Sequence, residues 1–111
     1  MAEPEPIEPT PTFMDDVKIA LRVSSSAYDD EIEMLIDAAI ADLYLAGISE
    51  DKLPEPEEDP TDPLIKRAIV TYCKAHFGYD NPEAERFEKA YNAIKLHLML
   101  SSEYGGTADA V

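Results

Sequence analysis

The stretch YDDEIEMLIDAAIADLYLA, residues 28–46, carries the clearest helical pattern in the chain. Its apolar side chains recur every three or four residues, which places them along one side of an α-helix. These residues are Ile32, Leu35, Ile36, Ala39, Ile40 and Leu43. Gly47 follows the last of the pattern, and glycine suits the left-handed residue that ends many helices. We therefore predict a helix over 28–46 with one side in a protein core.

The same helix carries two further surfaces. Asp30, Glu33 and Asp37 line the side opposite the core, and a second apolar set lies well away from the core stripe. This second set is Met34, Ala38 and Leu45. A helix with two apolar sides is either central in its bundle or in contact with another subunit. Because the chain holds few helices, we favour the second reading and predict these three residues at a subunit interface.

Three other segments have the marks of helices. They cover residues 14–23, 63–78 and 82–101. Asp62 and Pro63 form a strong start signal, and Asn81 and Pro82 form another. Gly78 marks the end of the segment between them. No segment shows sustained strand alternation, so we predict an all-α fold, a small bundle of about four helices.

The remaining segments predict one domain with loose ends. Residues 1–13 are rich in proline and glutamate, and we expect a flexible arm that packs no core, although such an arm could also order on a partner. The loop 49–62 holds three prolines and seven acids, which indicates a solvated linker or a loop that reaches a partner. We expect residues 14–104 to form the helical domain and 105–111 to be a flexible tail.

The charge distribution limits the classes of partner. The 111 residues carry a formal net charge of −15, and 17 of the 24 acids lie in residues 1–60 with only 3 bases. Tight binding to nucleic acid needs clustered Lys and Arg, and this pattern is absent from the sequence. No apolar segment is long enough for a membrane span, and the acidic N-terminus is unlike a signal peptide, so a soluble, cytoplasmic setting is expected.

The stretch HFGYDNPEAERF, residues 76–87, is the best candidate for chemistry. The chain has only two histidines, His76 and His97, and no spacing typical of a metal site. Cys73 and His76 could be neighbours on a helix, but no orienting group or oxyanion hole can be recognised beside them. We predict no catalysis, cofactor or metal. Tyr79 and Arg86 have no evident role within the chain and become candidates for a subunit contact.

Three blocks in series carry a resemblance to a known family. They are VKIALRV followed by DDEIEMLIDAAIADLYLAGI, then DPLIKRAIVTYCKAHFGYD, then NPEAERFEKAYNAIKLHLMLSSEY. Their order resembles the head–tail connectors of tailed phages, the small all-helical, ring-forming adaptors that complete the head. The resemblance covers about residues 14–104, and the Pro- and Glu-rich arm departs from it.

The resemblance implies a structural role in the virion neck. Such proteins form a ring beneath the portal, extend the DNA channel and give the stopper or tail a platform, after assembly in the host cytoplasm. Asp30, Glu33 and Asp37 would then line the channel and let double-stranded DNA pass without binding it. The charge also leaves open a second class, an acidic DNA mimic or regulatory protein-binding module, and a small hydrolase is a distant third.

Overall fold

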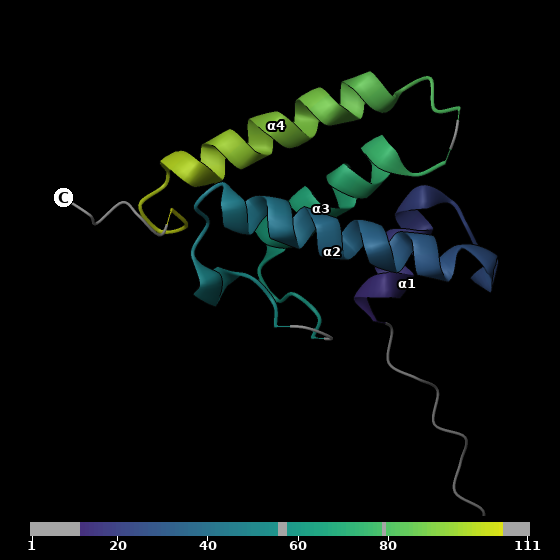
Figure 1. The fold of residues 1–111 in the computed structure, drawn as a ribbon, viewed down its shortest axis with the longest axis horizontal. Coiled ribbons are helices and arrows are strands. Elements are labelled where there is room, and N and C mark those ends of the chain that lie inside the picture. The colour runs from purple at the N-terminus through teal and green to yellow at the C-terminus, as the bar shows by residue number, and fades with distance from the viewer. Residues whose placement is uncertain (1–11, 56–57, 79, 106–111) are drawn as a thin grey trace, which may run out of the picture.

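The computed structural model describes residues 12–55, 58–78 and 80–105, which form four α-helices and two short 3-10 helices (Figure 1). The α-helices are α1 (Phe13–Leu21), α2 (Asp29–Leu45), α3 (Pro63–His76) and α4 (Ala84–Leu100). The 3-10 helices are η1 (Ser26–Tyr28) and η2 (Glu50–Lys52). Within these ranges there is no strand, only an isolated bridge between Ile48 and Gly105. The predicted all-α fold is confirmed.

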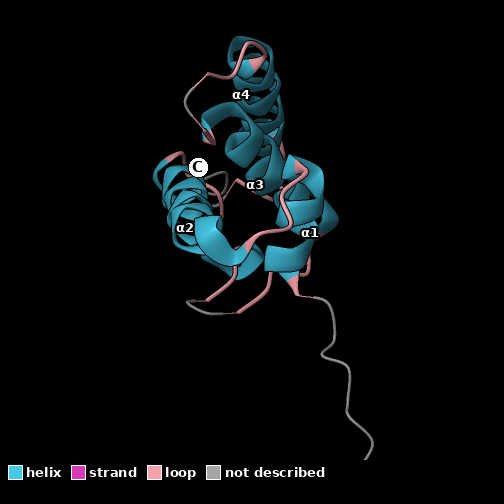
Figure 2. Cartoon of the chain, turned by 90° about the vertical axis from the view of Figure 1, so that its right-hand side faces the viewer, coloured by secondary structure: helices cyan, strands magenta, loops and turns pink. Residues whose placement is uncertain are grey.

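Helix α3 is the central element of the bundle. It packs against α1, α2 and α4, which surround it in the end-on view (Figure 2). Its apolar pattern fits this position, because Ile65, Ala68, Ile69 and Cys73 are fully buried. The core that they share with the other elements also includes Phe13, Val17, Ile32, Ala39, Leu43, Ile48, Tyr91, Leu98 and Tyr104.

Helix α1 begins one residue earlier and ends two residues earlier than the predicted segment 14–23. The Thr12 side chain accepts from the backbone N–H of Asp15, and the Asp15 carboxylate accepts from the N–H of Thr12, which forms a capping box. Phe13 therefore lies in the helix and is only 4% exposed, although the sequence placed it in the arm. Residues 1–11 of the predicted arm lie outside the described residues.

Helix α2 matches its predicted segment within one residue at each end. Its apolar stripe enters the core as expected, with Ile32, Ala39 and Leu43 fully buried. Gly47 follows in the left-handed region with a φ of 101°. The capping prediction at this position is confirmed.

The loop 49–62 is packed at both of its ends. Leu53 contacts the core, and Pro60 is buried. The Asp59 carboxylate accepts from the N–H of Phe13 at 3.2 Å, so it also caps α1. The prediction of a wholly solvated linker is wrong for these residues, because backbone donors at a helix start attract nearby carboxylates. Residues 56 and 57 lie outside the described part.

The corner between α3 and α4 differs from the predicted capping pattern. Helix α3 ends at His76 rather than at Gly78, and α4 begins at Ala84 rather than at Pro82. Asn81 makes a turn before the helix instead of capping it: its Oδ1 accepts from the N–H of Glu83 at 3.0 Å, and its Nδ2 donates to the carbonyl of Lys74 at 2.7 Å. The prediction that Asn81 caps α4 and Pro82 opens it is wrong, because the Asn81 side chain stabilises the turn that precedes the helix.

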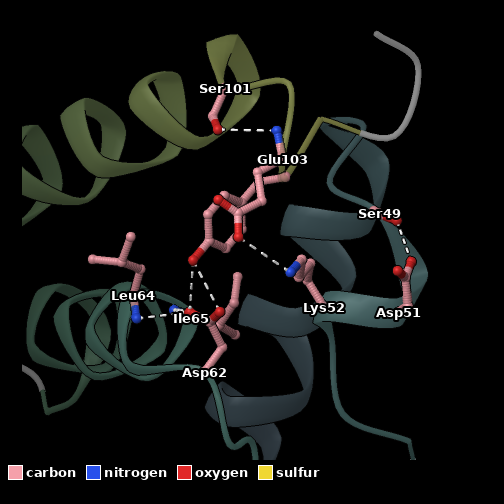
Figure 3. Close-up of polar contacts among 9 residues, drawn as sticks. Ser49, Asp51, Lys52, Asp62, Leu64, Ile65, Ser101 and Glu103 are labelled. Atoms are coloured by element: carbon pink, nitrogen blue, oxygen red, sulfur yellow. Dashed lines mark hydrogen bonds and ion pairs between the residues drawn. The ribbon is translucent and has the colours of Figure 1, made fainter. Parts of the chain in front are cut away.

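The chain after α4 folds back onto the start of α3. The Tyr104 hydroxyl donates to the Asp62 carboxylate at 2.9 Å, and the N–H of Ser49 donates to the carbonyl of Tyr104 at 2.7 Å. Asp62 also accepts from the N–H groups of Leu64 and Ile65, and Lys52 forms an ion pair with Glu103 nearby (Figure 3). Tyr104 and Gly105 are therefore buried, and residues 106–111 lie outside the described part.

Candidate subunit interface

The outer side of α2 presents large apolar side chains to solvent. Met34 is 66% exposed and Leu45 is 81% exposed, and Ala38 lies half-buried on the same side. These positions are four and seven residues apart, a spacing that aligns them along one side of a helix. The core stripe occupies the opposite side, so nothing in the described part of the chain covers Met34 or Leu45.

The second apolar side of α2 was explained either by a central position of α2 in the bundle or by contact with another subunit. The structure places α3 at the centre instead. A central α2 would have buried both sides, but α2 lies at the edge of the bundle (Figure 2). Ile19, Leu96 and Leu100 are other exposed apolar residues, and they stand on α1 and α4. On α2 the exposed apolar residues lie beside three exposed acids.

Asp30, Glu33 and Asp37 are exposed on α2 beside the apolar side. None has an ion-pair partner among residues 12–55, 58–78 and 80–105. Two other acids of α2 do have partners: Asp29 pairs with Lys18 at 2.7 Å and Asp42 with Lys95 at 2.9 Å. The three exposed carboxylates therefore give this face of the molecule an uncompensated negative charge.

Of the two other predicted interface residues, Arg86 lies on α4 rather than on α2. Arg86 lies in the first turn of α4, where its guanidinium pairs with the Glu83 carboxylate and stands 4.9 Å from the centre of the Phe87 ring. It is exposed, but its charge is already compensated. Tyr79 lies outside the described residues.

Cys73 and His76 do not form a nucleophile and a base. The Cys73 side chain is fully buried, and burial raises the pKa of its thiol to about 12. A thiol with that pKa stays protonated near neutral pH and is a poor nucleophile. His76 is exposed at the last residue of α3, where the centre of its ring lies 4.4 Å from the centre of the Tyr72 ring.

A polar cluster that sequence reasoning missed joins α2 to α4. The Asp42 carboxylate accepts from the Tyr91 hydroxyl at 2.5 Å and from the Lys95 ammonium at 2.9 Å. Burial raises the pKa of Asp42, but these hydrogen bonds and the charge of Lys95 outweigh it and leave the pKa below its ordinary value. Burial and the bond to Asp42 raise the pKa of Tyr91.

This cluster joins α2 to α4 through two hydrogen bonds and an ion pair. Its carboxylate is ionised, its phenol is protonated, and the groups satisfy one another. The spacing of Tyr91 and Lys95, four residues apart on one side of α4, was the signal that could have indicated a shared partner.

The described part of the chain has no cluster of three or more His, Cys, Asp or Glu side chains that could hold a metal ion. Within the same residues, no helix is long and apolar enough to cross a bilayer.

Fold and surface together define a small helical protein with a row of exposed apolar side chains on the outer side of α2. A scan against protein families identifies the class: residues 13–105 match the model described as phage connector protein. The match covers most of the chain, so the protein belongs to the phage connector family. No curated protein and no solved structure matches the chain significantly.

Family membership gives the chain a structural role at the junction of phage head and tail. The family is not an enzyme family, and its members act through contacts with other proteins of the virion neck or capsid. The expected connector function is therefore confirmed at this level.

Proposed function

We propose that the chain is a head-completion adaptor that forms a ring beneath the portal. In this role it extends the DNA channel and links the capsid to the stopper or tail. The observation that supports the proposal is the uncovered apolar side of α2, which needs a protein partner although the bundle has a complete core. Repeated copies of the chain would supply that partner around a ring.

The subunit contact that we propose includes Met34, Ala38 and Leu45. Tyr79 and Arg86 remain candidates at the α3–α4 corner, where a neighbouring copy or the portal could reach them. These assignments extend the prediction made from the sequence, and the exposure of Met34 and Leu45 supports them.

Asp30, Glu33 and Asp37 are proposed to face the channel. A ring multiplies their uncompensated charge by the number of subunits, and the resulting negative potential repels the phosphate backbone of DNA. Double-stranded DNA would then pass the ring without binding to it.

Electron microscopy of the full chain tests the proposed ring. The protein is examined at high concentration, alone and mixed with the portal protein of the same phage. We expect rings with a central hole, and native mass spectrometry should give one subunit number. A chain that remains monomeric under both conditions would contradict the ring role while leaving the family assignment intact.

A further inference from the structure

A groove between α3 and α4 is lined mainly by apolar and small side chains. Its lining residues are Leu64, Arg67, Ala93, Ile94, His97 and Leu98. The only charged or titratable groups among them are Arg67 and His97, and no carboxylate lines it. Such a groove can accept an apolar helix side that is flanked by acids.

This groove faces away from α2. On α4, Lys95 turns toward Asp42 of α2, with 2.9 Å between the ammonium and the carboxylate. Ala93 and His97 are two residues before and two residues after Lys95, and two residues correspond to about 200° of helix rotation. The outer side of α2 and the groove are thus distinct surfaces, as a head-to-tail contact requires.

The charges of the two surfaces are complementary. Asp30, Glu33 and Asp37 stand beside the apolar side of α2, and none of them has an ion-pair partner in the described ranges. Arg67 lines the groove and likewise has no ion-pair partner among the described residues. An acidic surface and a basic one favour this pairing of copies over a pairing of two like faces.

We infer that the apolar side of α2, formed by Met34, Ala38 and Leu45, lies in the α3–α4 groove of the next copy. The inference rests on the ring proposed above and names the two surfaces that meet in it. Apolar side chains of α2 contact the groove, and the small Ala93 leaves room for them.

The row of acids on α2 stands along one edge of this contact. Carboxylates at that edge can face the channel and still attract Arg67 of the next copy, because charges interact over a Debye length of about 8 Å at physiological salt. The proposed channel lining and the proposed contact are therefore compatible.

Cysteine cross-linking of the full chain tests the contact. A chain that carries both Met34→Cys and Ala93→Cys is treated with a short bifunctional thiol cross-linker at the concentration where wild type forms rings. We expect a ladder of dimers, trimers and larger species on a denaturing gel, because each copy joins a different neighbour at each end. Native Cys73 is buried and should not react.

Position-matched controls give the experiment its specificity. The pair Met34→Cys with Asn92→Cys moves the second thiol one residue along α4, about 100° around the helix, and should give no ladder. Arg67→Glu in the ladder-forming chain should abolish the ladder, whereas Arg67→Lys should keep it. Circular dichroism verifies that each variant keeps its helices.

The outcomes separate this contact from the ring itself. If rings appear in the micrographs but the 34–93 pair gives no ladder, the proposed contact is wrong and the ring role is unaffected. The same conclusion holds if the 34–92 pair gives an equal ladder. A wild-type chain that forms no rings, alone or with the portal, would overturn both.

Discussion

Asp42 shows how a single acid on a core-facing helix can be stabilising. Three of the six acids of α2 are exposed, but Asp42 is half-buried and accepts from both Tyr91 and Lys95. A charged hydrogen bond of this kind contributes more than a surface ion pair because its partners are already ordered by packing. The residue therefore links two helices that are not adjacent in the sequence.

We predict that Asp42→Asn lowers the free energy of unfolding by about 1 kcal/mol, because an amide accepts the Tyr91 and Lys95 hydrogen bonds without a charge. Urea denaturation at pH 7 measures the difference. Tyr91→Phe should cost a similar amount, and the double variant should cost less than the sum of the two, since Asp42→Asn weakens the same hydrogen bond that Tyr91→Phe removes. Additive effects would show that Asp42 and Tyr91 do not stabilise the fold through a shared interaction.

The effect of Asp42→Asn should depend on pH with a definite sign. The folded-state pKa of Asp42 is below its ordinary value, so its contribution is present above the unfolded-state pKa of about 3.9. It is lost as the pH falls through the folded-state pKa. The two denaturation curves should therefore converge in acid, and a difference that persists well below pH 3 would show that the charge of Asp42 is not the cause.

At the scale of elements, the start of α3 organises more of the chain than a single helix. The Asp62 carboxylate accepts from Leu64 and Ile65 in the first turn of α3 and from Tyr104 after α4. Tyr104 in turn packs in the core, and the bond to Asp62 raises the pKa of its phenol. One N-cap thus fixes the position of the C-terminal turn.

Asp62→Ala is expected to lower the free energy of unfolding by about 1–2 kcal/mol through loss of the N-cap. Asp62→Asn is the matched control, because Asn caps helices equally well and can still accept from Tyr104. Hydrogen exchange at Ser49, whose N–H donates to the Tyr104 carbonyl, reports on the turn. Equal loss of protection in both variants would rule out a role of Asp62 as cap and anchor.

In the ring that we propose, the outer side of α2 is the surface most directly tied to assembly. Met34→Glu or Leu45→Glu should leave the far-ultraviolet circular dichroism of the protein unchanged, because both side chains are exposed, and should reduce ring formation in analytical ultracentrifugation. Ile19→Glu on α1 is the control, since Ile19 is 73% exposed outside the proposed contact. Normal assembly by both α2 variants would exclude this side as the interface.

For the whole molecule, the uneven charge is the property with the widest consequence. The excess of acid lies in residues 1–60, and in the folded chain part of it gathers on the outer side of α2 as Asp30, Glu33 and Asp37. A ring that carries these residues on its inner wall would present a negative channel to DNA.

Replacing Asp30, Glu33 and Asp37 with Lys tests whether these residues line the channel. We expect the variant ring to retard double-stranded DNA in a gel, with binding that weakens as salt rises, while the wild-type ring leaves DNA free. Changing Asp15 and Glu85, exposed acids on α1 and α4, to Lys provides a control with fewer added charges. Equal DNA retention by the two variants would mean that the α2 acids do not line the channel.

Helix type and approximate helix position were available from the sequence because they depend on local interactions. The period of Ile32, Leu35, Ile36, Ala39, Ile40 and Leu43 specifies a helix side whatever packs on it, and Asp62 with Pro63 specifies a start within a few residues. The same pattern separated the Met34 side of α2 from its core side. Errors arose at Asn81, where a turn and a cap use the same residue type.

Tertiary structure alone decided which elements meet. The sequence could not show that α3 is central, that Asp59 caps α1, that Asp42 lies against Tyr91 and Lys95, or that Tyr104 returns to Asp62. Each of these contacts joins residues more than 40 positions apart in the chain or depends on the packing of whole helices. Local periodicity carries no information about such pairs, because they form only when the buried surfaces of all four helices are satisfied together.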